Sequence, residues 1–104
     1  MFGFLKKLFG GSSVDLGEVM SKKPYLVDVR TPMEYNQGHP KGSVNIPLNT
    51  VGSNIKKFKG KEHIVVFCQS GNRSGQAASI LRSNGIENVV NGGSWRNVAR
   101  YTGQ

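Results

Sequence analysis

Short apolar runs alternate along the chain with segments whose apolar residues recur at helical spacing. The clearest run covers residues 64–67, Ile-Val-Val-Phe, and is rich in β-branched side chains. Such a run is typical of a strand that is buried on both faces of a sheet. Further strands are predicted at residues 25–30, 43–46 and 88–91, with a strand end near Val14 before a helix that runs to Lys23. Gly92-Gly93 is expected to turn the chain after the last of these strands.

Helix-start signals appear between the predicted strands. Thr31 is a predicted N-cap, because Pro32 follows at the first helical position and Glu34 stands three residues after it. Asp15 and Glu18 have the same capping-box spacing. The other helices are predicted at residues 75–82, where Ala77, Ala78 and Leu81 share one face with Ser74, and at residues 94–101, where Trp95 and Val98 face inward, while residues 48–58 are either helical or irregular.

The alternation of strands and helices predicts one α/β domain over residues 14–104. A chain of 104 residues supports one hydrophobic core but not two. We expect a small central parallel sheet of about five strands with helices on both faces. Ligand sites in such sheets lie at the carboxyl ends of the strands. Cys68 lies at one such end, and the pair Asp28 and Arg30 lies at another, so we expect the two ends to converge on one pocket.

Residues 1–13 are predicted to be an extension outside this domain. At helical spacing, the apolar residues of positions 2–9 fall on one side, and Lys6 and Lys7 fall on the other. A flexible Gly-Gly-Ser-Ser link follows. The segment either packs on the domain or hangs loose, lies in a membrane interface or binds a partner, or is a remnant of targeting. A single short amphipathic helix has only weak affinity for membranes.

The composition restricts the chemistry. A formal net charge of +8 fits a solvated basic surface, small anionic substrates, nucleic acid or an anionic membrane surface. Nucleic acid is not expected, because the basic residues are scattered, apart from the lysines at 56, 57, 59 and 61, and no RNA-binding or zinc-finger pattern occurs. One cysteine excludes an internal disulfide, and two histidines without a cluster of partners predict no metal site. No membrane span or signal peptide is predicted, so we expect a cytoplasmic protein.

The stretch from Cys68 to Ser74 has the residues of a reactive thiol site. The only cysteine stands where a buried strand ends and a helix is about to begin. Backbone N–H groups can wrap around such a position, and Gly71 permits a backbone angle that other residues avoid. The helix start adds partial positive charge, so we expect a lowered pKa and a reactive thiolate at Cys68.

This stretch resembles the active-site loop of the rhodanese-like sulfurtransferases, Cys-x-x-Gly-x-Arg-Ser, with Cys68, Gly71, Arg73 and Ser74 in register. Other motifs of that family follow the same order along the chain. The family's late tryptophan usually stands further from its glycines than here, so the last helix is open to a different placement. The further matches are Asp28-Val29-Arg30 with Glu34-Tyr35, then Gly38-His39, Gly42 and Asn45-Ile46-Pro47, with Ser43 in place of alanine, and finally Gly92-Gly93 before Trp95.

The resemblance implies sulfur transfer from a small anionic donor such as thiosulfate, through a persulfide on Cys68, to a thiol or cyanide acceptor. No cofactor besides this covalent intermediate is implied. A protein is a further candidate acceptor, and a monomer is expected. The substrate-binding residues are predicted to be Gln69, Ser70, Gly71, Asn72, Arg73 and Ser74, with backbone N–H groups holding the sulfur and Arg73 neutralising the donor. Asp28 and Arg30 are expected to form a buried pair that braces the loop, and His39 to be structural.

Two other functions use similar residues. A phosphatase or arsenate reductase also has a cysteine loop at a helix start, but its loop holds one residue more than the four between Cys68 and Arg73. The shorter loop favours a single sulfur atom over a phosphate group. A non-enzymatic binding or regulatory module on the same fold is the second alternative, and such modules often lack the cysteine that this chain has.

Overall fold

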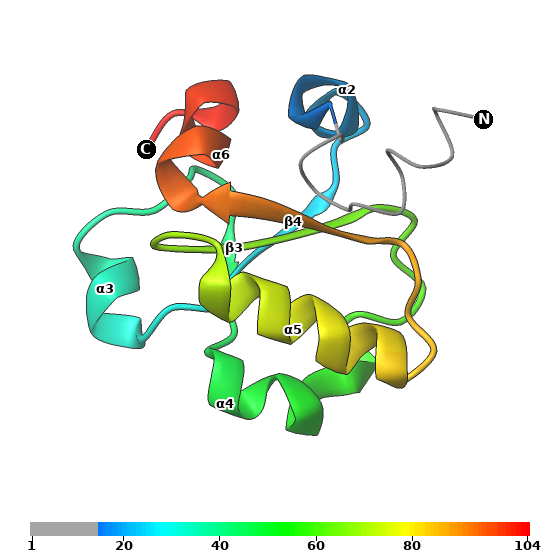
Figure 1. The fold of residues 1–104 in the computed structure, drawn as a ribbon. Helices are drawn as coiled ribbons and strands as arrows, with labels where there is room; N and C mark the ends of the chain where they lie inside the picture. The colour runs from blue at the N-terminus through cyan, green and yellow to red at the C-terminus, as the bar shows by residue number, and fades with distance from the viewer. Residues whose placement is uncertain (1–14) are drawn as a thin grey trace.

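The computed structural model describes residues 15–104, which form an α/β domain: a parallel β-sheet covered by helices (Figure 1). The four strands lie in the order β2-β1-β3-β4, all parallel. The predicted fold class is therefore confirmed, with four strands in the described part where about five were expected. The strand end predicted near Val14 lies outside the described residues. The strands are β1 (Tyr25–Asp28), β2 (Val44–Asn45), β3 (Ile64–Cys68) and β4 (Val89–Ser94).

Helices cover both faces of this sheet. Helices α4 and α5 lie on one face, and α2 and α6 lie on the other (Figure 1). Helix α3 lies beyond the ends of the central strands, on the side where α5 begins. The helices are α2 (Leu16–Ser21), α3 (Pro32–Asn36), α4 (Leu48–Val51), the 3₁₀ helix η2 (Gly52–Lys57), α5 (Asn72–Ser83) and α6 (Trp95–Thr102).

Strand β3 connects the two halves of the core. Successive side chains of a strand point to opposite faces, so Ile64 and Val66 pack toward α5, while Val65 and Phe67 pack toward α6. Every residue of the strand is buried. Full burial of each such aliphatic side chain contributes about 1.5–3 kcal/mol to folding. The uninterrupted apolar run is therefore explained by helices that cover both faces.

The predicted helix starts are present. Thr31 Oγ1 accepts a hydrogen bond from the Glu34 N–H, and Glu34 Oε1 accepts one from the Thr31 N–H, which completes a capping box. Asp15 caps α2 through the Glu18 N–H alone. Each such cap is worth about 1 kcal/mol of helix stability.

Two local predictions near the cysteine were wrong. Helix α5 begins at Asn72, three residues before the predicted start, so Arg73 and Ser74 lie in its first turn and not in a loop. Gly92 and Gly93 were expected to turn the chain, but both lie within β4. A Cβ atom on Gly92 would stand 2.8 Å from Val65 Cγ1, so glycine is required there by close packing rather than by a turn.

Candidate active site

Cys68 ends β3 at the edge where α5 begins, and three residues connect the two elements. Gly71 closes this connection with a φ of 103°, a left-handed conformation that glycine adopts without strain. A Cβ atom at Gly71 would also stand 3.4 Å from the Gly93 Cα atom of the neighbouring strand. The chain therefore folds back tightly over the thiol before the helix starts.

The Cys68 sulfur lies inside a cradle of hydrogen-bond donors. The Gly71 N–H donates to Sγ at 3.0 Å, the Ser74 N–H donates at 3.4 Å, and Ser74 Oγ lies 3.4 Å away. Burial raises the pKa of the thiol, but the hydrogen bonds from Ser74, Gly71 and Ser70 together outweigh it, so the pKa of Cys68 is lowered. The first turn of the 12-residue helix α5 adds positive potential at the same point. The site therefore stabilises the ionised form of Cys68 more than water does.

Removing the Ser74 hydroxyl is expected to raise the pKa of Cys68. In Ser74→Ala the sulfur loses a hydroxyl partner whose proton, directed at Asn91 in the structure, can rotate to donate to the ionised form. The pH dependence of iodoacetamide alkylation measures this pKa, and its midpoint is expected to move upward. Ser70→Ala is the matched control, because Ser70 acts on the sulfur through its backbone and keeps that group. An equal shift in both variants, or none in Ser74→Ala, would contradict the assignment.

Asn91 on β4 supports the Cys68 loop through hydrogen bonds. This role was not predicted from the sequence. Its Nδ2 donates to the Gly71 carbonyl at 3.0 Å, and its Oδ1 accepts from Ser74 Oγ at 2.7 Å. The same Oδ1 accepts from the Gly93 N–H at 2.9 Å. One side chain therefore links the loop, the first turn of α5 and β4. The available signal was a polar residue that interrupts the apolar start of that strand.

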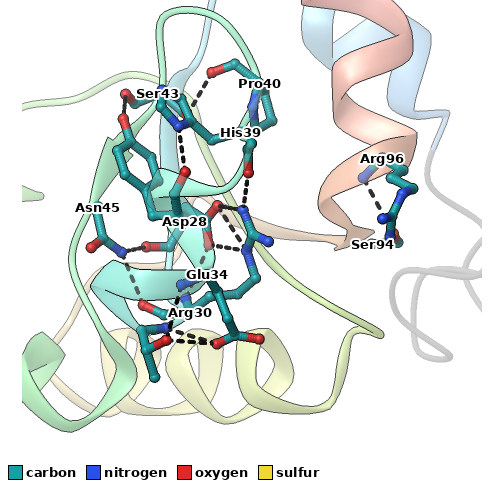
Figure 2. Close-up of polar contacts among 12 residues, drawn as sticks. Asp28, Arg30, Glu34, His39, Pro40, Ser43, Asn45, Ser94 and Arg96 are labelled. Atoms are coloured by element: carbon teal, nitrogen blue, oxygen red, sulfur yellow. Dashed lines mark hydrogen bonds and ion pairs between the residues drawn. The ribbon is translucent and has the colours of Figure 1, made fainter. Parts of the chain in front are cut away.

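Asp28 and Arg30 form a buried pair at the end of β1 (Figure 2). Arg30 donates to both carboxylate oxygens of Asp28 at 2.6–3.0 Å, and the two side chains are 3% and 0% exposed. Arg30 also donates to the Gly38 carbonyl at 2.7 Å and lies 4.7 Å from the centre of the Trp95 ring. These contacts join the pair to the turn after α3 and to the start of α6. The described support of the Cys68 loop comes instead from Asn91.

Arg73 extends from the first turn of α5 to Glu34 on α3. Its two terminal nitrogens donate to the two carboxylate oxygens at 2.8 and 3.0 Å. The hydrogen bond from Arg73 is the largest cause that lowers the pKa of Glu34 to about 2, and the Thr31 N–H adds to it. Both side chains remain about one-third exposed. Glu34 was predicted as a helix cap only, yet it also positions the arginine of the motif.

The Glu34–Arg73 pair is expected to make stability depend on acid pH. A carboxyl group whose pKa is depressed on folding stabilises the protein above its ordinary pKa near 4.5, and this contribution is lost as the pH falls toward 2. For an exposed pair, solvent screening limits the contribution to about 1 kcal/mol or less. Urea unfolding of the parent and Glu34→Gln should therefore differ at pH 7 and converge near pH 2. A difference that grows with acidification would refute this account.

His39 takes no part in the thiol cradle. Its Nδ1 lies 2.7 Å from the Tyr35 carbonyl, and its ring stacks on the Tyr35 ring with 3.6 Å between centroids. These contacts fit the expected structural role in the turn after α3. Within residues 15–104, no three His, Cys, Asp or Glu side chains are grouped closely enough to bind a metal ion. No helix in the same part of the chain is long and apolar enough to cross a membrane.

A cysteine sulfur that is cradled by backbone amides at the end of a central parallel strand, with four residues between it and an arginine, defines the rhodanese class of site. The model of the rhodanese-like domain matches residues 12–99 of this chain. The chain belongs to the rhodanese-like family.

Relatives and solved structures agree with this membership. The Escherichia coli thiosulfate sulfurtransferase PspE is 37% identical over 75 residues, which cover 70% of this chain and 72% of PspE. The Bacillus subtilis protein YqhL is also 37% identical, over 67% of this chain and 56% of its own length. An E. coli rhodanese solved with anions superposes with a TM-score of 0.65 at 36% identity, covering 72% of this chain and 91% of the other. The human single-domain sulfurtransferase TSTD1 gives 0.68 at 28% identity, covering 82% and 89%.

Proposed function

We propose that the protein is a sulfurtransferase of the thiosulfate type that works through a Cys68 persulfide. The Cys68 thiolate attacks the outer sulfur of thiosulfate, the S–S bond of the donor breaks, and its electron pair leaves with sulfite. A thiolate or cyanide acceptor then attacks the outer sulfur of the persulfide. This second step breaks the new S–S bond and regenerates the Cys68 thiolate.

The observation that carries the proposal is the convergence of N–H groups on the Cys68 sulfur. The Gly71 and Ser74 N–H groups already point at Sγ, and Asn91 fixes the loop that presents them. Preorganised donors of this kind stabilise an anionic sulfur without reorganising during the reaction. The names of PspE and TSTD1 support the same reaction class.

Two parallel assays separate this function from its alternatives. We expect turnover of thiosulfate with cyanide or a dithiol as acceptor, and no hydrolysis of para-nitrophenyl phosphate. A phosphoryl group brings three charged oxygens, each of which needs its own donors, and the four-residue loop is too small to supply them. Phosphate hydrolysis faster than sulfur transfer would assign the chain to the phosphatase alternative. Absence of both activities in folded protein would favour a binding module.

Replacing Arg73 is expected to weaken the use of thiosulfate. The hydrogen bond to Glu34 raises the pKa of the guanidinium, and the Cys68 charge adds to this, so Arg73 is a permanent cation beside the thiolate. A charge-assisted hydrogen bond to the donor is worth about 1.5–3 kcal/mol, so Arg73→Ala should raise the KM for thiosulfate about tenfold or more.

Glu34→Gln provides the opposing variant. It leaves Arg73 in place but removes the carboxylate that competes with the donor for the guanidinium. We therefore expect the KM for thiosulfate to fall relative to the parent. Steady-state kinetics at fixed acceptor concentration measure both variants. Equal KM values in the parent and Arg73→Ala would remove Arg73 from donor binding.

A further inference from the structure

A concave surface lies at the opposite end of the sheet from Cys68. It is a pocket of about 410 Å³ that is formed by two turns, one before β1 and one before β3. The strands run in parallel, so both turns lie at the amino end of the sheet, and Cys68 lies at the carboxyl end. Its lining residues are Lys22, Lys23, Pro24, Tyr25, Gly60, Lys61, Glu62 and His63.

The charge of this pocket is not neutralised by carboxylates. Among residues 15–104, the side-chain ion pairs within 4.0 Å are Asp28–Arg30 and Glu34–Arg73, and neither involves a lysine of the pocket. Residues 1–14 contain no aspartate or glutamate. Three lysines therefore line one concavity together with a single glutamate that pairs with none of them. An excess of positive charge around a concavity attracts anions to it.

The walls of the pocket are held in place by the fold. Asn88 Nδ2 donates to the Lys61 and Glu62 carbonyls, which fixes the turn before β3. The turn before β1 is fixed by the Tyr25 N–H, which donates to the His63 carbonyl at 2.8 Å. In this turn Lys23 has a φ of 54°, the one left-handed residue other than glycine in the described chain. The pocket is thus preformed, as small-molecule sites usually are.

The Tyr25 ring, which lines the pocket, orients the ammonium group of Lys61. The Lys61 ammonium lies 4.6 Å from the centre of the Tyr25 ring, within the range of a cation–π contact. The Tyr25 ring is packed edge-on against the buried Phe58. Burial raises the pKa of Tyr25, so its hydroxyl stays protonated and can donate a hydrogen bond.

We propose that this pocket binds the phosphate groups of an anionic ligand, at a site separate from the Cys68 cradle. Lysines bind phosphate as compact point charges, and three of them suit a multiply charged group such as a diphosphate. The volume is in the range of small-molecule sites. Four residue steps along β3 separate Ile64, beside the pocket, from Cys68, a distance of roughly 13 Å. A ligand bound in the pocket therefore does not contact Cys68. The phosphate can belong to a soluble compound or to a lipid headgroup.

The test titrates the full chain with inorganic pyrophosphate and follows backbone amide shifts by NMR. We expect shifts at residues 22, 23, 25 and 60–63, and none beyond the background at residues 68–74. The triple variant Lys22→Gln, Lys23→Gln, Lys61→Gln should weaken binding at least about tenfold, because even one lost charge-assisted bond has that effect. The control Lys41→Gln, Lys56→Gln, Lys57→Gln removes the same charge from exposed positions outside the pocket and should stay within about twofold.

A second arm identifies the source of the phosphate. Cosedimentation with vesicles of phosphatidylcholine and phosphatidylglycerol is measured for both triple variants. Loss of vesicle binding in the pocket variant alone indicates a lipid headgroup, and loss of pyrophosphate binding alone indicates a soluble ligand. Lys61→Gln, a single change at an exposed side chain, serves if the triple variant unfolds. Equal weakening in pocket and control variants, or amide shifts spread over the whole surface, would overturn the proposal.

Discussion

Cys68→Ser is expected to reduce sulfur transfer by about three orders of magnitude or more, to the background of the assay. Serine keeps the shape of the cradle, but its hydroxyl is not ionised near neutral pH and is a poor nucleophile without an adjacent base. Cys68 is the only cysteine in the chain, so no second thiol can replace it. Steady-state transfer from thiosulfate to cyanide measures the loss.

Unfolding must be excluded as the cause of this loss. Cys68 is 1% exposed and packs with the core on the α5 side, so its replacement also affects packing. Cys68→Ala, which keeps the site apolar, is the second variant, and it is expected to be equally inactive. Both variants should show cooperative thermal unfolding. Undiminished transfer by either folded variant would end the assignment of Cys68 as nucleophile.

The largest expected loss of stability follows from Asp28→Ala. The change leaves the Arg30 guanidinium, which is 3% exposed, without the carboxylate that accepts three of its hydrogen bonds. Breaking one side of a buried pair costs about 3–5 kcal/mol. A domain of this size is typically stable by only about 5–15 kcal/mol, so much of the folding free energy should disappear. Urea denaturation gives this value directly.

The exposed pair supplies the comparison for this prediction. Glu34→Ala breaks an ion pair of similar geometry whose partners are about one-third exposed, and the pairing itself is worth about 1 kcal/mol or less. The double variant Asp28→Ala, Arg30→Leu removes both buried charges and should be more stable than Asp28→Ala alone. If Asp28→Ala were no more destabilising than Glu34→Ala, the buried pair would not have the structural role inferred from its contacts.

Local signals in the sequence were sufficient to predict the architecture. The apolar run at residues 64–67 indicated a strand covered on both faces, and the structure places β3 at the centre of two core clusters. Thr31 and Glu34, which stand three residues apart, indicated the start of a helix. Both hydrogen bonds of the predicted capping box are present. Signals of this kind depend on neighbours within a few positions of each other, so one sequence contains them completely.

Contacts between distant segments could not be predicted in the same way. Asn91 reaches Ser74 across 17 positions, and Glu34 reaches Arg73 across 39. The residues that neighbour Asn91 or Glu34 in the chain do not indicate the partner of either. The partners meet only because the strands and helices pack together in the folded protein. Gly92 shows the same limit, because its glycine is required by Val65 on the neighbouring strand and not by a local turn. The position of the cradled cysteine was thus predictable, whereas the residues that position its loop and Arg73 were not.

Intact-protein mass spectrometry after incubation with thiosulfate tests the persulfide mechanism most directly. We expect the protein to gain the mass of one sulfur atom, the gain to map to the peptide that contains Cys68, and cyanide or a dithiol to remove it. Cys68→Ser should gain nothing under the same conditions. No gain in the folded parent protein, or an equal gain in Cys68→Ser, would contradict the account.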